Sequence, residues 1–409
     1  MPSLRPLLSI LLPMVVLTSV AQAHVHPIEP IDDSPLMASR TYEQQLIDAL
    51  DGIREQRWDE AMVQLEQLIE RNPTFRLAQL VYADLMLARS GVVKGFGGAN
   101  GEASVVADLR DEALRRWTHH AAPPPNGKIP PYLLELSDNQ RNAIVVDQER
   151  ARLYLLRNEG GRAVLMENSY VSGGRNGMLK EVEGDQRTPI GVYFVLSHIP
   201  GSRLPPLYGW GAFPINYPNE WDRHLGRTGF GIWLHGNPDG NFSRPPQDSD
   251  GCITMYDRDI EALAEFIQVG HTPVIISERI DWVDPQLVET QRQELRSVID
   301  QWITDWESLD ADRYLAHYSP TFSAYGQDHA AWSSHKRRVN AAKRYINVEL
   351  SDLSLFAYPG ERDLVVATFV QAYRSSNFNS TSRKRQYWQR EADGQWRIIY
   401  EGPGVWRDR

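Results

Sequence analysis

Cysteine is almost absent from this chain, since Cys252 is the only one in 409 residues. A single cysteine excludes an intramolecular disulfide, and no pair of cysteines or histidines with metal-ligand spacing lies near it. An excess of basic residues is also lacking, because 43 lysines and arginines face 53 aspartates and glutamates, which gives a formal net charge of −10. We therefore expect no nucleic-acid partner and no structural metal.

Long apolar runs are missing as well, apart from one at the start of the chain. Residues 1–23 carry a single positive charge at Arg5, an apolar stretch from Leu7 to Val20, and then Ala21-Gln-Ala23. This pattern is typical of a secretory signal peptide and is too short to favour a membrane span. The sequence therefore predicts an exported, periplasmic protein without a membrane span in its mature chain.

The chemistry of the chain is concentrated around its lone cysteine. His235 lies seventeen residues before Cys252 and offers a base for the thiol proton, while Gly251 allows close backbone approach to the sulfur. A helix predicted to begin at Asp257 has its N-terminus nearby, which we expect to favour the thiolate. The ordinary alternative is that the cysteine is a small buried apolar residue.

The segment resembles the signature of the L,D-transpeptidase (YkuD-type) catalytic domain. That signature has a histidine-glycine pair, a spacer, then Ser-x-Gly-Cys and an apolar residue, which His235-Gly236 and Ser249–Ile253 match. The resemblance implies that Cys252 is the nucleophile, that His235 is the base, and that the Gly236 carbonyl orients His235. It also implies that Ser249, Asp250 and Gly251 support the oxyanion site, and that no cofactor is needed.

Two positions depart from the family pattern. Asp250 stands where histidine is common, and Thr254 stands where the family most often has an arginine thought to meet a substrate carboxylate. Arg223 and Arg227 are candidates to replace that arginine. The aromatic rings of Tyr208 and Trp233 are candidates to line a substrate groove, with burial in the core as the alternative.

The region before the catalytic segment is predicted to be helical. Apolar residues recur at helical spacing from Trp58 to Leu85, with a break at Asn72-Pro73, and resemble one tetratricopeptide (TPR) unit. One unit is too few for a solenoid, so a helical hairpin docked on its neighbour or on a second copy is the favoured interpretation. Ala121–Gly127, with three consecutive prolines, is predicted to open a linker over 121–137.

Short apolar strands are predicted from Asn142 onward, separated by Gly, Asn and Asp turns, which favours a mostly antiparallel sheet. The last region opens with a helix predicted over Leu287–Leu309, followed by strands over Ile346–Phe356, Leu364–Tyr373, Arg385–Glu391 and Trp396–Glu401. This α+β pattern resembles the NTF2-like (SnoaL-like) cone. Its many tryptophans and tyrosines are predicted to form either core or the wall of a pocket.

The sequence thus predicts a multidomain protein with a helical TPR-like segment (24–120), a linker (121–137), a mainly-β L,D-transpeptidase catalytic domain (138–283) and an α+β NTF2-like cone (286–409). This order resembles cell-shape L,D-carboxypeptidases of Gram-negative bacteria, and it implies peptidoglycan stem peptides as substrate. Three hypotheses remain: an L,D-transpeptidase, an L,D-carboxypeptidase, and an inactive wall-binding scaffold. The helical and NTF2-like domains are candidate sites for a glycan or protein partner.

Overall fold

The computed structural model describes residues 38–92, 97, 103–238 and 241–404. The signal peptide predicted over 1–23 lies outside these residues. No helix within the described ranges is both long enough and apolar enough to cross a membrane.

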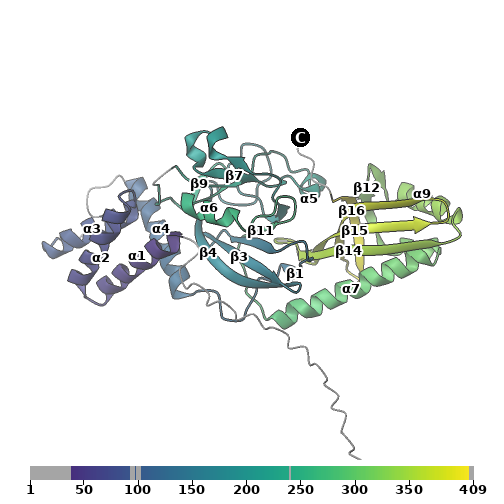
Figure 1. The fold of residues 1–409 in the computed structure, drawn as a ribbon, viewed down its shortest axis with the longest axis horizontal. Coiled ribbons are helices and arrows are strands. Elements are labelled where there is room, and N and C mark those ends of the chain that lie inside the picture. Colours follow the sequence, from purple (N-terminus) through teal and green to yellow (C-terminus); the bar gives the residue numbers. More distant parts are fainter. Residues whose placement is uncertain (1–37, 93–96, 98–102, 239–240, 405–409) are drawn as a thin grey trace, which may run out of the picture. The chain divides into compact units, whose positions relative to one another are not determined.

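Four helices form the first part of the chain (Figure 1). They are α1 (Ala38–Arg54), α2 (Trp58–Arg71), α3 (Arg76–Arg89) and α4 (Ala103–Ala121). Ala61, Leu65 and Leu77 are fully buried between them, as the helical spacing predicted, and Leu46 of α1 is buried beside them. Phe242 from the central domain also belongs to this apolar cluster, so the helices pack on their neighbour.

The central domain is built on a sheet with the strand order β5-β11-β2-β3-β4-β10-β8-β7-β6, in which β9 pairs separately with β4. Its elements are β2 (Asn142–Asp147), β3 (Arg152–Glu159), β4 (Arg162–Gly174), β5 (Gly191–Phe194), β6 (Ile199–Pro200), β7 (Gly211–Pro214), α5 (Glu220–His224), β8 (Trp233–His235), β9 (Gln247–Ser249), β10 (Ile253–Met255), α6 (Asp257–Ala264) and β11 (Pro273–Ser277). Most pairs are antiparallel, but β8 and β10 run parallel to each other.

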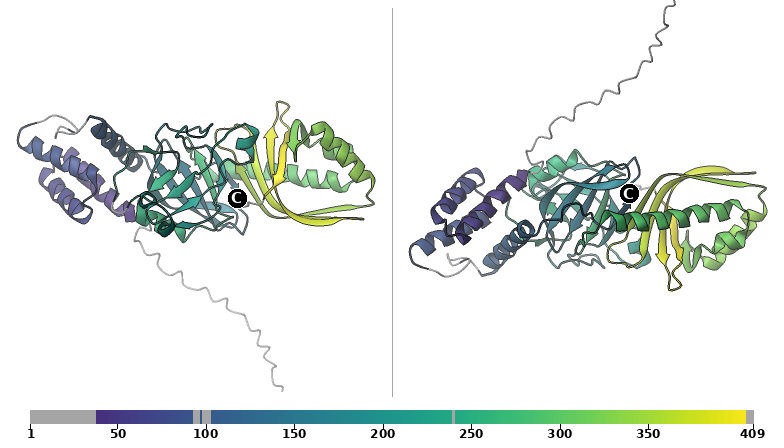
Figure 2. Two further views of the ribbon diagram at one scale, coloured as in Figure 1. Left: turned by 90° about the horizontal axis from the view of Figure 1, so that it is seen from above. Right: turned by 90° about the horizontal axis from the view of Figure 1, so that it is seen from below.

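The last domain has three helices around a curved sheet. Its elements are α7 (Pro285–Glu307), α8 (Ala311–Leu315), β12 (Tyr318–Ala324), β13 (Gln327–Asp328), α9 (His329–Ala341), β14 (Ile346–Ala357), β15 (Leu364–Ser375), β16 (Asn379–Arg390) and β17 (Trp396–Pro403). Figure 2 shows α7 lying along one side of this sheet. The aromatic side chains predicted as core or pocket wall, Trp302, Trp306, Tyr318, Trp332, Tyr373 and Trp388, are all buried in one apolar cluster, which favours the core interpretation.

The segment predicted as a linker contains a strand of the last domain's sheet. Helix α4 ends at Ala121, but β1 (Leu133–Glu135) pairs antiparallel with β14. A shared apolar cluster joins the two domains and includes Phe194 and Trp221 from the central domain and Phe356 and Tyr387 from the last one. The proline-rich stretch therefore separates the helices from a strand that helps to join the central domain to the last one.

Buried charges lie where the helices meet the central domain. Glu43 on α1 accepts a 2.8 Å hydrogen bond from Arg152 on β3 and lies 3.4 Å from a guanidinium nitrogen of Arg116 on α4. Burial alone raises the pKa of Glu43, but the charges of Arg152 and Arg116 outweigh it and lower the pKa to about 2. Glu43 is therefore the carboxylate partner of Arg152 and lies near Arg116, which itself donates to Glu112 at 2.9 and 3.0 Å; both arginines have almost no contact with solvent.

Replacing Glu43 with glutamine is expected to lower the free energy of unfolding by about 3–5 kcal/mol, because the buried guanidinium group of Arg152 loses its carboxylate partner. Chemical denaturation at neutral pH measures this loss. Glu60→Gln is the control, since Glu60 pairs with Arg57 on the exposed surface and is expected to contribute about 0–1 kcal/mol. A loss in Glu43→Gln no larger than the control's would contradict the account.

The wild type and Glu43→Gln also test how this contribution to stability depends on pH. Because the folded pKa of Glu43, about 2, lies below its usual value of 4.5, its contribution is fully present above roughly pH 4.5 and is lost as the pH falls toward 2. The stability difference between the wild type and Glu43→Gln should shrink over that window.

Candidate active site

His235 and Cys252 are brought together by two neighbouring parallel strands. Ile253 on β10 pairs with Leu234 on β8, and Thr254 pairs with His235. Because side chains alternate between the faces of a sheet, His235 and Thr254 share one face, and Cys252, two residues before Thr254, belongs to that face too. Ile253 and Leu234 point to the opposite face and are fully buried in the core.

The ring of His235 is held in one tautomer. Its Nδ1 lies 2.7 Å from the carbonyl oxygen of Gly236, which can only accept a hydrogen bond. Nδ1 is therefore protonated, and Nε2 carries the free lone pair. Burial lowers the pKa of His235 to about 4, although the bond to Gly236 raises it in part. At neutral pH this histidine is an uncharged base.

The thiol of Cys252 is half-buried and donates a 3.3 Å hydrogen bond to the carbonyl of Gly231. Its pKa is raised to about 11, mainly by burial and in part by the charge of Asp250; the backbone N–H of Trp233 and the charge of Arg244 act in the opposite direction. The resting thiol is therefore protonated. Helix α6 begins at Asp257 as predicted, but β10 lies between it and Cys252, and the expected preference for the thiolate is not seen.

The turn before Cys252 depends on Ser249 and Gly251. The Ser249 hydroxyl donates to the Cys252 carbonyl at 2.6 Å and accepts from the Gly251 N–H at 3.1 Å. Gly251 has φ +124°, and a Cβ there would lie 2.7 Å from the Arg187 carbonyl oxygen, so only glycine fits. Since the Gly251 N–H is already bonded, the amides of Asp250 and Cys252 are the remaining oxyanion candidates of this turn.

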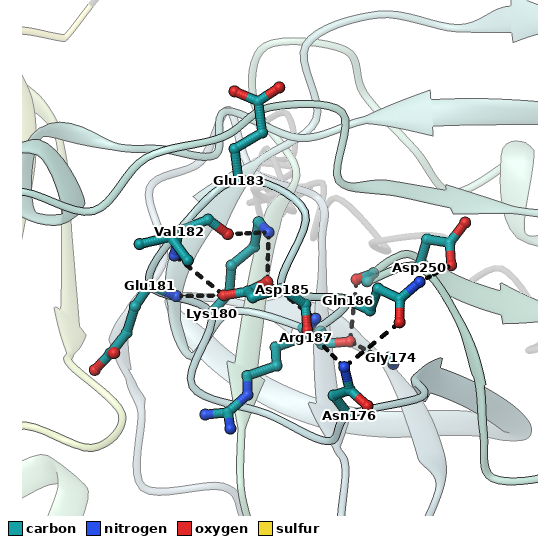
Figure 3. Close-up of polar contacts among 12 residues, drawn as sticks. Gly174, Asn176, Lys180, Glu181, Val182, Glu183, Asp185, Gln186, Arg187 and Asp250 are labelled. Carbon is teal, nitrogen blue, oxygen red and sulfur yellow. Dashed lines mark hydrogen bonds and ion pairs between the residues drawn. The ribbon is translucent and has the colours of Figure 1, made fainter.

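Asp250 lies on the surface and contacts the loop that follows β4. Its carboxylate accepts a 3.2 Å hydrogen bond from Gln186 and lies 3.2 Å from a guanidinium nitrogen of Arg175. Figure 3 shows the centre of this loop, where Lys180 and backbone N–H groups converge on Asp185. These bonds hold the pKa of Asp185 at about 2, which indicates a structural role in shaping the loop.

The two aromatic candidates lie beside the histidine. The ring of Tyr208 contacts that of His235 edge-on, with centroids 4.8 Å apart, and lies 5.1 Å from the ring of Trp233. Burial raises the pKa of Tyr208, and the charge of Asp250 adds to this effect, as does that of Cys252 once its thiol ionises at high pH. These rings therefore border the face that carries His235 and Cys252.

Of the two arginine candidates, one is already paired and the other lies on the surface. Arg227 forms a 3.0 Å ion pair with the buried carboxylate of Asp222, while Arg223 is exposed on α5. Sequence reasoning missed Arg244, whose charge lowers the pKa of both Cys252 and His235. The only signal for it was its position between the histidine and the cysteine. Among the described residues, no group of three or more His, Cys, Asp or Glu is arranged to hold a metal ion.

Comparison with protein families assigns the central domain and the last domain. The L,D-transpeptidase (YkuD) catalytic domain matches residues 141–276, a range that includes His235 and Cys252, and the Cds6 C-terminal NTF2-like domain matches residues 294–402. The chain carries an L,D-transpeptidase catalytic domain followed by an NTF2-like domain. The predicted fold class, with helices first, a mainly-β catalytic domain and an α+β cone, is confirmed.

Solved structures share this two-domain arrangement. Bd1075 of Bdellovibrio bacteriovorus is 28% identical, with a TM-score of 0.60 over 69% of this chain and 100% of that one. The helical cell shape determining protein Pgp2 of Campylobacter jejuni is 23% identical, with a TM-score of 0.56 over 66% of this chain and 95% of that one, a likeness of fold. A comparison with curated proteins gave no match.

Alkylation of Cys252 in the L,D-transpeptidase domain tests its resting state. Because the thiol is protonated at neutral pH, the rate with iodoacetamide should rise about tenfold per pH unit between roughly pH 7 and 10. Mass spectrometry gives the rate directly, since every label reports on the only cysteine. A rate that levels off below about pH 8 would indicate a thiolate–imidazolium pair and contradict this description.

Proposed function

We propose that the protein is a periplasmic cysteine acyltransferase of peptidoglycan remodelling, which acts on the bond between meso-diaminopimelate and D-alanine in tetrapeptide stems. The supporting observation is the fixed tautomer of His235, with Nε2 unprotonated, on the strand next to Cys252. A neutral base beside a protonated thiol suits proton transfer during attack, as opposed to a preformed thiolate. The match to the L,D-transpeptidase domain supports a wall substrate.

In the first half-reaction the Cys252 thiol turns from the Gly231 carbonyl toward His235. The sulfur attacks the carbonyl carbon of the L-centre of diaminopimelate, and the thiol proton passes to His235 Nε2. The carbonyl oxygen becomes an oxyanion near the amides of Asp250 and Cys252. The C–N bond then breaks, the departing D-alanine amine takes the proton from Nε2, and a thioester remains on Cys252.

The acceptor of the thioester decides between two activities. Attack by an amine of a second stem forms a 3-3 crosslink, which is the L,D-transpeptidase reaction. Attack by water releases a tripeptide, which is the L,D-carboxypeptidase reaction. The second candidate is favoured by Thr254 in place of the common arginine. Pgp2, which shares the fold, is described as a determinant of helical cell shape.

A third candidate, an inactive scaffold that binds the wall, is disfavoured because the base, the thiol and the turn between them are all in place. In this third candidate, the helical segment and the NTF2-like domain would serve as sites for a glycan or protein partner. Export of the chain is supported by the signal-peptide pattern of residues 1–23.

The products of disaccharide tetrapeptide identify the activity. The mature protein should release D-alanine together with either tripeptide or crosslinked dimer, each resolved by mass. Cys252→Ala should reduce product formation by roughly 10³- to 10⁶-fold, by analogy with other nucleophile substitutions. His235→Gln, which keeps a similar volume but provides no base, is expected to show a comparable loss. Activity that persists in Cys252→Ala would refute the thioester mechanism.

A further inference from the structure

Thr254 stands where the family most often has an arginine, and its side chain leaves a buried polar gap at that position. Thr254 pairs with Ser172 on β4 and with His235 on β8, so the three side chains form a row across the active-site face. Thr254 and Ser172 are each 1% exposed. Neither hydroxyl has a hydrogen-bond partner within the described part of the chain. Unpaired buried hydroxyls are costly, and the cavity beside them, of about 10 Å³, has room for no more than one water.

Arg244 reaches the same gap from the loop between β8 and β9. It lines one small cavity together with Ser172, Thr254 and Asn237, and its side chain is 16% exposed. One terminal nitrogen, Nη1, donates to Asn237 Oδ1 at 2.7 Å, and the other, Nη2, donates to the Asp248 carbonyl at 3.2 Å. Nε lies 3.1 Å from the Asp248 carboxylate. Each terminal nitrogen therefore keeps a second N–H, and together the two can bind a carboxylate.

The N-terminal helices hold this loop in place. The ring of Phe242 packs against Phe75, with centroids 4.4 Å apart, and edge-on against Tyr42 at 5.6 Å. The next residue, Ser243, accepts a 2.9 Å hydrogen bond from the backbone N–H of Leu77 at the start of α3, and both partners are buried. Arg244 follows directly, so its backbone position depends on contacts with the helical segment.

We propose that Arg244 is a specificity-determining residue that binds a carboxylate of the stem peptide next to the scissile amide, and that the N-terminal helices position it for this purpose. The proposal rests on the proposed function. Arg244 would take the role of the absent arginine from a different loop, above the row formed by Ser172, Thr254 and His235. The carboxylate belongs either to the departing D-alanine or to the D-centre of diaminopimelate.

Steady-state kinetics with disaccharide tetrapeptide test the binding role. Arg244→Ala should raise KM about 10- to 100-fold, the range of a lost charged hydrogen bond, with a much smaller change in kcat. Arg244→Lys, which restores the charge without the planar fork, should have a KM between those of the wild type and Arg244→Ala. Arg279→Ala is the control, because Arg279 is exposed and also pairs with an aspartate, Asp281; it should match the wild type.

Two amidated substrates identify the carboxylate without any mutation. One carries an amide at the D-alanine carboxyl, and the other carries it at the D-centre of diaminopimelate. Amidation of the recognised carboxylate should raise KM for the wild type by the same 10- to 100-fold range of about one charged bond and have little effect on Arg244→Ala. The proposal is overturned if the ratio of KM between Arg244→Ala and the wild type is the same for both amidated substrates. It is also overturned if Arg244→Ala lowers kcat but leaves KM unchanged.

The positioning role of the helices is tested by a double-mutant cycle. Phe242→Ala and the milder Ser243→Ala should raise KM in the wild type but cause no further increase in Arg244→Ala, because both act through Arg244. Additive effects would overturn the link to the helices. If the wild type itself yields neither tripeptide nor crosslinked dimer, the proposed function fails, a result distinct from a normal KM in Arg244→Ala.

Discussion

Two short strands, β8 and β10, lie side by side in parallel, and their register determines where every reacting group of the catalytic domain lies. The pairing of Thr254 with His235 brings the proposed base, the proposed nucleophile Cys252 and the side chain of Thr254 onto one face, while Ile253 and Leu234 anchor the opposite face in the core. A slip of one residue would exchange these faces and bury the reactive groups. The positions of His235 and Cys252 thus depend on the burial of Ile253 and Leu234 in the core, which fixes the register of the two strands.

The second constraint is the electrostatic state of the site before substrate arrives. Burial keeps both His235 and Cys252 uncharged at neutral pH, and Asp250, which replaces the family's common histidine, adds to the pKa of the thiol. In the proposed mechanism, charges are therefore separated only during attack, when the thiol proton moves to Nε2 and backbone donors face the new oxyanion. In such a site the thiol is expected to react slowly with general thiol reagents and to become nucleophilic only when substrate is bound.

The sequence was sufficient to predict the order of domains and most strands, because period-two apolar patterns carry that information. The motif also pointed to His235 and Cys252, which the register of β8 and β10 places close together. The sequence could not reveal that β1 pairs with β14, since strand partners far apart in sequence are set by tertiary packing. The sequence also pointed to Arg223 and Arg227 and not to Arg244, because the loop that carries Arg244 is held by contacts, here of Phe242 with Phe75 and of Ser243 with Leu77, that no local pattern encodes.

The central claim, that Cys252 carries the acyl group, is tested most directly by intact-protein mass spectrometry of the enzyme quenched during turnover of tetrapeptide. The account predicts a covalent adduct with the mass of the tripeptide acyl group, mapped to Cys252, cleaved by hydroxylamine as a thioester and absent from Cys252→Ala. Turnover without any adduct on Cys252, or with an adduct on another residue, would contradict it.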